Sequence, residues 1–137
     1  MRRGFKIGLL SAFCILLAVS TAYAGFSGSI RFHQKGGTLT YQVFVENGKV
    51  TSGYQSFGTK PPFAKLVGGW YDGRHLVVLG QFNGYDITDQ YFSFSQHFRL
   101  DRGRNMFILE QALWGYKKTM DTDRLYTQHD IDEIRGQ

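Results

Sequence analysis

The dipeptide Asn47-Gly48 separates two segments in which apolar and polar residues alternate, and this pattern constrains the fold most strongly. A two-residue type I′ turn needs positive φ at both central positions, which Asn and Gly adopt readily. From the turn outward, the predicted pairs are Glu46 with Lys49, Val45 with Val50, Val43 with Ser52 and Tyr41 with Tyr54. Apolar pairs then share one face, while opposite charges meet beside the turn. The sequence therefore predicts an antiparallel β-hairpin centred on Asn47-Gly48.

The same alternation is found closer to the N-terminus, before the glycine pair Gly36-Gly37. The apolar side of this segment is predicted to carry Phe26, Gly28, Ile30 and Phe32. A loop of Lys35-Gly36 pairs Ile30 with Tyr41, whereas a loop of Gly36-Gly37 pairs it with Val43. The two registers differ by an even number of residues, so the same side chains face inward in both.

Asp72-Gly73 predicts a further hairpin. The segment 63–67 before it fits a strand, or a helical turn that follows Pro61-Pro62, and the spacing to the turn favours the strand. With a two-residue loop, the predicted pairs are Tyr71 with Arg74, Trp70 with His75, Val67 with Val78 and Leu66 with Leu79. Both faces of this hairpin are apolar. We therefore expect it to lie centrally, or to line a cavity or an interface with one face.

The remaining segments extend the β pattern to the C-terminus. Residues 91–100 alternate, with Phe92, Phe94, Phe98 and Leu100 on one face and Tyr91, Ser93, Ser95, His97 and Arg99 on the other. Residues 106–116 fit either a strand or a helical stripe, and the turn spacing favours the strand. After Thr122 we expect one short strand at 125–127, followed by a polar end that is helical or frayed.

Seven to eight short strands separated by glycine-containing turns predict an all-β fold, a small antiparallel up-and-down meander. A barrel is preferred over a two-sheet sandwich because hairpins dominate and no long crossover is evident. An outer-membrane barrel is the alternative for an exported, aromatic-rich β chain. The outward face of the first three strands holds Ser, Thr, Arg, Lys and Gln, whereas lipid contact needs an apolar band. We therefore expect a soluble domain that does not insert stably into a membrane.

The first 24 residues have the pattern of a cleavable secretory signal. A basic start precedes an apolar run from Ile7 to Val19, and Ala22-Tyr23-Ala24 provides small residues for cleavage. An uncleaved anchor is the alternative, but the apolar run is much shorter than the roughly 20 residues of a membrane-spanning helix. We therefore expect residues 1–24 to be removed and residues 25–137 to form a single β-rich domain that is periplasmic or secreted.

Composition excludes several classes of protein for residues 25–137. Loss of Arg2, Arg3 and Lys6 with the signal lowers the formal net charge from +5 to +2, and no Lys/Arg-rich stretch remains. Nucleic acid is therefore not expected as a partner. The single cysteine, Cys14, leaves with the signal as well. We expect a domain without disulfides, thiolate metal sites or a cysteine nucleophile.

The titratable residues form no recognisable catalytic or metal-binding motif. The histidines lie on different segments of the chain. His33 and His97 share the polar parity of their strands, and they could bind a metal or act as a base if they were adjacent. The acidic clusters at 121–123 and 130–133 lack the glycine-containing loop of an EF-hand. We expect no catalytic residues, no bound metal and no cofactor.

The candidate binding residues are aromatic and basic side chains around the Asp72-Gly73 turn, together with one later tyrosine: Trp70, Tyr71, Arg74, His75 and Tyr85. Trp, Tyr and Arg are enriched at the hot spots of protein-recognition surfaces. The alternative is a buried tryptophan that closes one end of the barrel.

Export, small size and the lack of catalytic motifs favour a non-enzymatic domain that binds a partner protein in the cell envelope, as an inhibitor or accessory factor does. The alternative is a small β-barrel that carries an apolar small molecule or lipid. This alternative is suggested by the two apolar faces of residues 66–79 and by the phenylalanines at 92, 94 and 98. It requires a cavity of about 300 Å³ or more. A hydrolase comes third, because histidines and acids would have to converge in a cleft.

Overall fold

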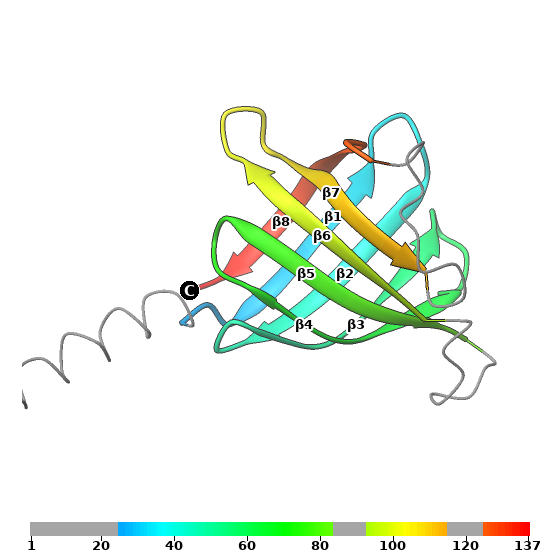
Figure 1. Cartoon of the computed structure of the whole chain (residues 1–137), viewed down its shortest axis with the longest axis horizontal. Coiled ribbons are helices and arrows are strands. Elements are labelled where there is room, and N and C mark those ends of the chain that lie inside the picture. Colours follow the sequence, from blue (N-terminus) through cyan, green and yellow to red (C-terminus); the bar gives the residue numbers. More distant parts are fainter. Residues whose placement is uncertain (1–24, 84–92, 115–124) are drawn as a thin grey trace, which may run out of the picture.

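Eight antiparallel strands close into a barrel in the computed structural model, which describes residues 25–83, 93–114 and 125–137 (Figure 1). The strands follow one another around the barrel in chain order, and the last pairs with the first. They are β1 (Gly28–Gln34), β2 (Leu39–Glu46), β3 (Lys49–Phe57), β4 (Ala64–Tyr71), β5 (His75–Phe82), β6 (Ser93–Asp101), β7 (Met106–Trp114) and β8 (Gln128–Gly136). The prediction of an all-β up-and-down barrel is confirmed.

Residues 1–24, which contain the expected signal and Cys14, lie outside the described residues. The described residues include no helix with the length and apolar character needed to cross a membrane.

The Asn47-Gly48 turn has the geometry that its sequence predicts, and the connection before it has one of the two predicted registers. Asn47 and Gly48 both have positive φ, 49° and 77°, as a type I′ turn requires. In the preceding hairpin, Ile30 pairs with Val43, which is the register of a Gly36-Gly37 loop. Local turn chemistry therefore sets the pairing of β1 with β2 and the start of the pairing of β2 with β3.

A β-bulge in β3 changes which side chains face the interior. Thr51 is an extra residue opposite β2, so the predicted pairs beyond Val50 are wrong: Val43 pairs with Gly53, and Tyr41 with Gln55. Gln55 consequently faces inward and is 4% exposed, whereas Tyr54 faces outward and is 37% exposed. The bulge thus places an amide inside the barrel where strict alternation predicts a tyrosine.

The loop between β4 and β5 is longer than the two residues predicted. Oδ1 of Asp72 accepts hydrogen bonds from the backbone N–H groups of Arg74 and His75, at 2.8 and 2.7 Å, and these bonds hold the wider turn. The observed pairs are Tyr71 with Leu76, Trp70 with Val77, Gly68 with Leu79 and Leu66 with Gly80, in place of those predicted. Near the turn the shift is of two residues, so each side chain there keeps its face.

The later part of the chain confirms one expectation and overturns another. Residues 106–114 form strand β7, as the turn spacing predicts. The expectation for the C-terminus is wrong, because Leu125 and Tyr126 lie in a turn and Gln128–Gly136 form strand β8. β8 closes the barrel by pairing with β1 (Figure 1). Its many charged residues obscure the apolar alternation by which a strand is recognised.

Apolar side chains fill the barrel from its middle to the end at which the chain termini meet. The middle layer is aromatic: the rings of Phe32 and Tyr41 stack at 4.5 Å, and Phe98 packs edge-on against Phe32 at 5.1 Å. Toward the termini, Phe26 packs edge-on against Tyr71 at 5.1 Å. The backbones of Ser27 and Gln137 are hydrogen-bonded here, and the rings of Phe26 and Tyr71 close this end of the barrel.

We predict that Gly53→Ala lowers the free energy of unfolding by about 1–3 kcal/mol, because the residue has a φ of 150° that L-residues rarely adopt. An added Cβ would also lie 2.3 Å from the backbone oxygen of Gln42. Gly37→Ala is the control, since its Cβ would meet only the flexible Gln34 side chain, at 3.4 Å. Denaturant unfolding that gives equal stabilities for the two variants would show that the bulge does not depend on this glycine.

Candidate functional site

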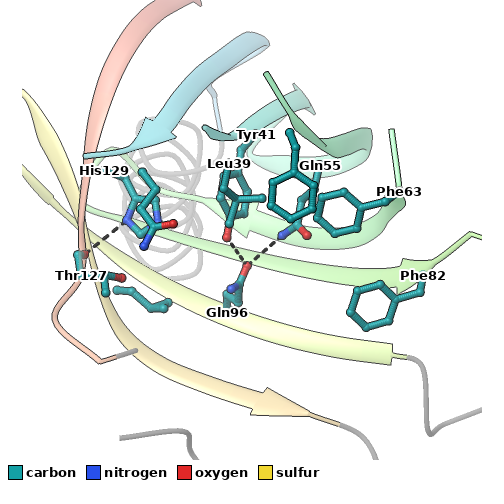
Figure 2. Close-up of a pocket in the computed structure, with 11 residues that line it drawn as sticks. Leu39, Tyr41, Gln55, Phe63, Phe82, Gln96, Thr127 and His129 are labelled. Atoms are coloured by element: carbon teal, nitrogen blue, oxygen red, sulfur yellow. Dashed lines mark hydrogen bonds between the residues drawn. The ribbon is translucent and has the colours of Figure 1, made fainter. Parts of the chain in front are cut away.

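A cavity of about 550 Å³ occupies the end of the barrel that lies away from the termini. Its walls come from the ends of several strands, including Gln34 at the end of β1, Leu39 at the start of β2 and Phe82 at the end of β5. Figure 2 shows Leu39, Phe82 and other lining side chains arranged around a shared space. The up-and-down topology brings the strand ends together here, so residues distant in the sequence form one site.

Three phenylalanines form an aromatic row along one side of the cavity. Phe57 ends β3, Phe63 precedes β4 and Phe82 ends β5, so the three lie on neighbouring segments. The rings of Phe57 and Phe63 stack at 4.6 Å, and those of Phe63 and Phe82 at 6.1 Å. Phe57 is 49% exposed. The row therefore provides a continuous apolar surface that runs from the solvent into the cavity.

The aromatic layer in the middle of the barrel forms the floor of the cavity. Tyr41 and His129 line the cavity, and both contact the ring of Phe98, at 5.5 and 5.1 Å between centroids. Tyr41 and Phe98 are 0% exposed, and His129 is 2% exposed. The cavity thus ends on a closely packed layer and does not continue through the barrel.

Two buried amides and a tyrosine form a hydrogen-bonded cluster in the cavity wall. The hydroxyl of Tyr41 donates to Oε1 of Gln96 at 2.9 Å, and Nε2 of Gln55 donates to the same oxygen at 3.1 Å (Figure 2). The two glutamines are 7% and 4% exposed. Burying an amide is costly unless it is hydrogen-bonded, so the cluster offsets part of the cost of placing these groups inside.

His129 on β8 is an uncharged imidazole at neutral pH. Burial lowers its pKa from 6.5 to about 4, outweighing the hydrogen bonds to the backbones of Thr127 and Phe107, which favour the charged form. Its Nδ1 lies 3.3 Å from the carbonyl oxygen of Thr127, so the nitrogen donates when it carries the proton. His129 therefore adds a polar group to the cavity and no charge.

The electrostatic character of the cavity follows from its residue types. Among the described residues that line it, none is an acid, a lysine or an arginine, and the polar members are amides, hydroxyls and one neutral imidazole. Leu39, Leu109 and the aromatic row supply its apolar surface. The site can therefore enclose an apolar body and form a few directed hydrogen bonds.

The structure separates the residues that the sequence singled out for binding. Trp70 and His75 lie together on the outer face of the barrel, with ring centroids 6.4 Å apart, and Arg74 is exposed in the adjoining loop. Tyr71 points into the closed end of the barrel, where it is 5% exposed and burial raises the pKa of its hydroxyl. Tyr85 lies outside the described residues.

The other three histidines lie on the outside of the barrel. Nε2 of His97 is 3.2 Å from Nδ1 of His75, while His33 lies 2.8 Å from a carboxylate oxygen of Asp132. His33 and His97 thus have different neighbours and do not form a pair. Within the described ranges, no three residues among His, Cys, Asp and Glu are grouped so that they could hold a metal ion.

The cavity residues were missed by sequence reasoning, although one signal was present. Gln96 stands between Phe94 and Phe98 at a position whose parity is inward, and an amide at such a position indicates a polar interior. Gln55 was hidden by the bulge at Thr51, and His129 by the unrecognised strand β8.

No protein-family model, curated protein or solved structure matches the chain. Its function is therefore argued from the geometry of the site.

We predict that protonation of His129 destabilises the protein in mild acid. Because its folded pKa is about 4 and its ordinary value is 6.5, the unfolded chain takes up the proton first as pH falls. The free energy of unfolding is therefore highest above pH 6.5, where His129 is neutral in both states. It falls by about 3 kcal/mol as the pH is lowered toward 4.

Unfolding in urea at several pH values between these limits measures the effect. His129→Leu removes the titrating group and should flatten the pH dependence of the unfolding free energy. Leu79→Gln on the outer face removes no titratable group; it is the control and should leave the dependence as it is. Equal slopes for wild type and His129→Leu would contradict the assignment.

Proposed function

We propose that this protein is an exported, non-enzymatic β-barrel that binds a small apolar molecule in its internal cavity. The observation that carries the proposal is the cavity of about 550 Å³, enclosed by apolar and aromatic side chains with a few polar groups. Small-molecule sites in proteins typically have volumes of about 300–1,000 Å³ and this mixture of lining residues.

The chemistry of the lining supports binding over catalysis. Among the described residues around the cavity there is no carboxylate, serine, cysteine or lysine to act as a nucleophile or as an acid. His129 is held by its backbone contacts in a packed aromatic layer. Export is part of the proposal and is supported by the basic start, the apolar run and Ala22-Tyr23-Ala24.

Binding of the uncharged fluorescent probe phenylnaphthylamine to residues 25–137 tests the proposal. We expect saturable binding, and we expect Leu39→Trp to weaken it at least about tenfold because the indole fills part of the cavity. Leu79→Trp is the matched control, since Leu79 lies on the outer face and is 42% exposed. No saturable binding, or equal affinity for Leu39→Trp and wild type, would contradict binding in the cavity.

A second candidate function is binding of a partner protein by the outer face of β4 and β5. Trp70 is 42% exposed and pairs with Val77, which lies on the same face of β5 as Leu79. Large apolar side chains grouped on a surface are typical of interaction sites. This surface retains Trp70 and His75 from the predicted binding residues.

Affinity capture from envelope extracts tests the second function. A partner bound through Trp70 should bind the Trp70→Ala variant about 30-fold more weakly, because a hot-spot tryptophan contributes roughly 2 kcal/mol. Tyr126→Ala is the control, since Tyr126 is 71% exposed and belongs to the turn before β8. Retention of every wild-type partner by Trp70→Ala would exclude this surface.

A further inference from the structure

We propose that the ligand of the cavity is an uncharged amphiphile, whose apolar body lies along the aromatic row and whose head group both donates and accepts a hydrogen bond at Gln55 and Gln96. Alcohols and primary amides have such heads. This inference rests on the proposed function and names its ligand class.

The hydrogen bonds of the amide cluster leave one amide oxygen and one amide nitrogen without a partner among the described residues. Oε1 of Gln96 accepts from both Tyr41 and Gln55, which uses one of the two N–H groups of Gln55 Nε2. In the described part of the chain, Oε1 of Gln55 and Nε2 of Gln96 have no hydrogen-bond partner, although both side chains are more than nine-tenths buried and line the cavity. A ligand group that donates to one and accepts from the other would satisfy both.

This conclusion does not depend on how the amide oxygens and nitrogens are assigned. If both amides were turned over, Nε2 of Gln96 would donate to Gln55 and Tyr41. Oε1 of Gln96 and Nε2 of Gln55 would then face the cavity. One amide oxygen and one amide nitrogen remain without a partner in either arrangement, so the cluster is complementary to a neutral head group in both.

Among the described residues that line the cavity, none would compensate a charged head group. Its described lining contains no Lys, Arg, Asp or Glu, and burial keeps His129 neutral at physiological pH. The titratable residues that act electrostatically on His129, His33 and Asp130, lie at the outer face and are partly exposed. A carboxylate or ammonium group would therefore lose its hydration without gaining an ion pair.

The aromatic row accounts for the other half of the ligand. Phe57 and Phe63 stack at 4.6 Å, and Leu39 faces the same cavity. None of these side chains has a polar atom, so they favour an aliphatic chain or an apolar ring. The amides and the phenylalanines line the same cavity, and one amphiphile can contact both groups.

Displacement of bound phenylnaphthylamine by decanol, decanoate and decylammonium at neutral pH tests the inference, because these three probes share a chain and differ in the head. We expect decanol to displace the reporter at a concentration at least tenfold lower than either ion. Equal or better displacement by decanoate or decylammonium would overturn the inference while leaving binding in the cavity intact. Failure of the reporter to bind would instead overturn the proposed function, and the inference with it.

Variants of the cluster locate the head group. Gln96→Leu and Gln55→Leu should each weaken decanol binding about five- to tenfold and change the affinity for phenylnaphthylamine less than twofold. Gln42→Leu, at a partly buried position of β2 outside the cavity, is the control and should change neither. Unchanged decanol affinity in both variants would overturn the placement of the head group at Gln55 and Gln96. Because there are two variants, the test can still be made if one of them fails to fold.

Discussion

The backbone pairing of β8 with β1 is the interaction on which the rest of the structure depends, because it turns an open meander into a closed barrel. The seam requires glycine: a Cβ on Gly28 would lie 1.8 Å from the backbone oxygen of Arg135, and one on Gly136 would lie 2.2 Å from that of Ser27. Exposed pairs such as Arg31 with Glu133 cross the same seam, but such pairs contribute about 1 kcal/mol or less. The close approach of the two backbones therefore determines closure.

Closure creates an interior whose two ends serve different purposes. From the middle layer to the termini, the large rings of Phe32, Phe98 and Phe107 pack against one another and supply the apolar burial that stabilises a small domain. At the other end, two amides and the aromatic row surround a hollow interior. The packed end holds the barrel in shape, so the open end keeps a cavity without collapsing onto it.

Local signals in the sequence predicted most of the strands and the Asn47-Gly48 turn, but not β8 and not the site. Asn47-Gly48 and the alternation of Ile30 and Phe32 predict hairpins because turn geometry and side-chain parity act over a few residues. The bulge at Thr51 reverses the parity of the residues that follow it, so Gln55 lies on the face opposite to the one that strict alternation predicts. The charged strand β8 is stabilised by its pairing with β1, at the other end of the described chain, and a local sequence pattern does not predict such long-range pairing.

Native mass spectrometry of residues 25–137, purified gently from an exporting host and then incubated with excess decanol, tests the central claim most directly. If the cavity takes up an uncharged amphiphile, the folded protein will carry one ligand that is lost on denaturation, and Leu39→Trp will carry less of it. A folded protein that keeps its bare mass both before and after the incubation would contradict the claim.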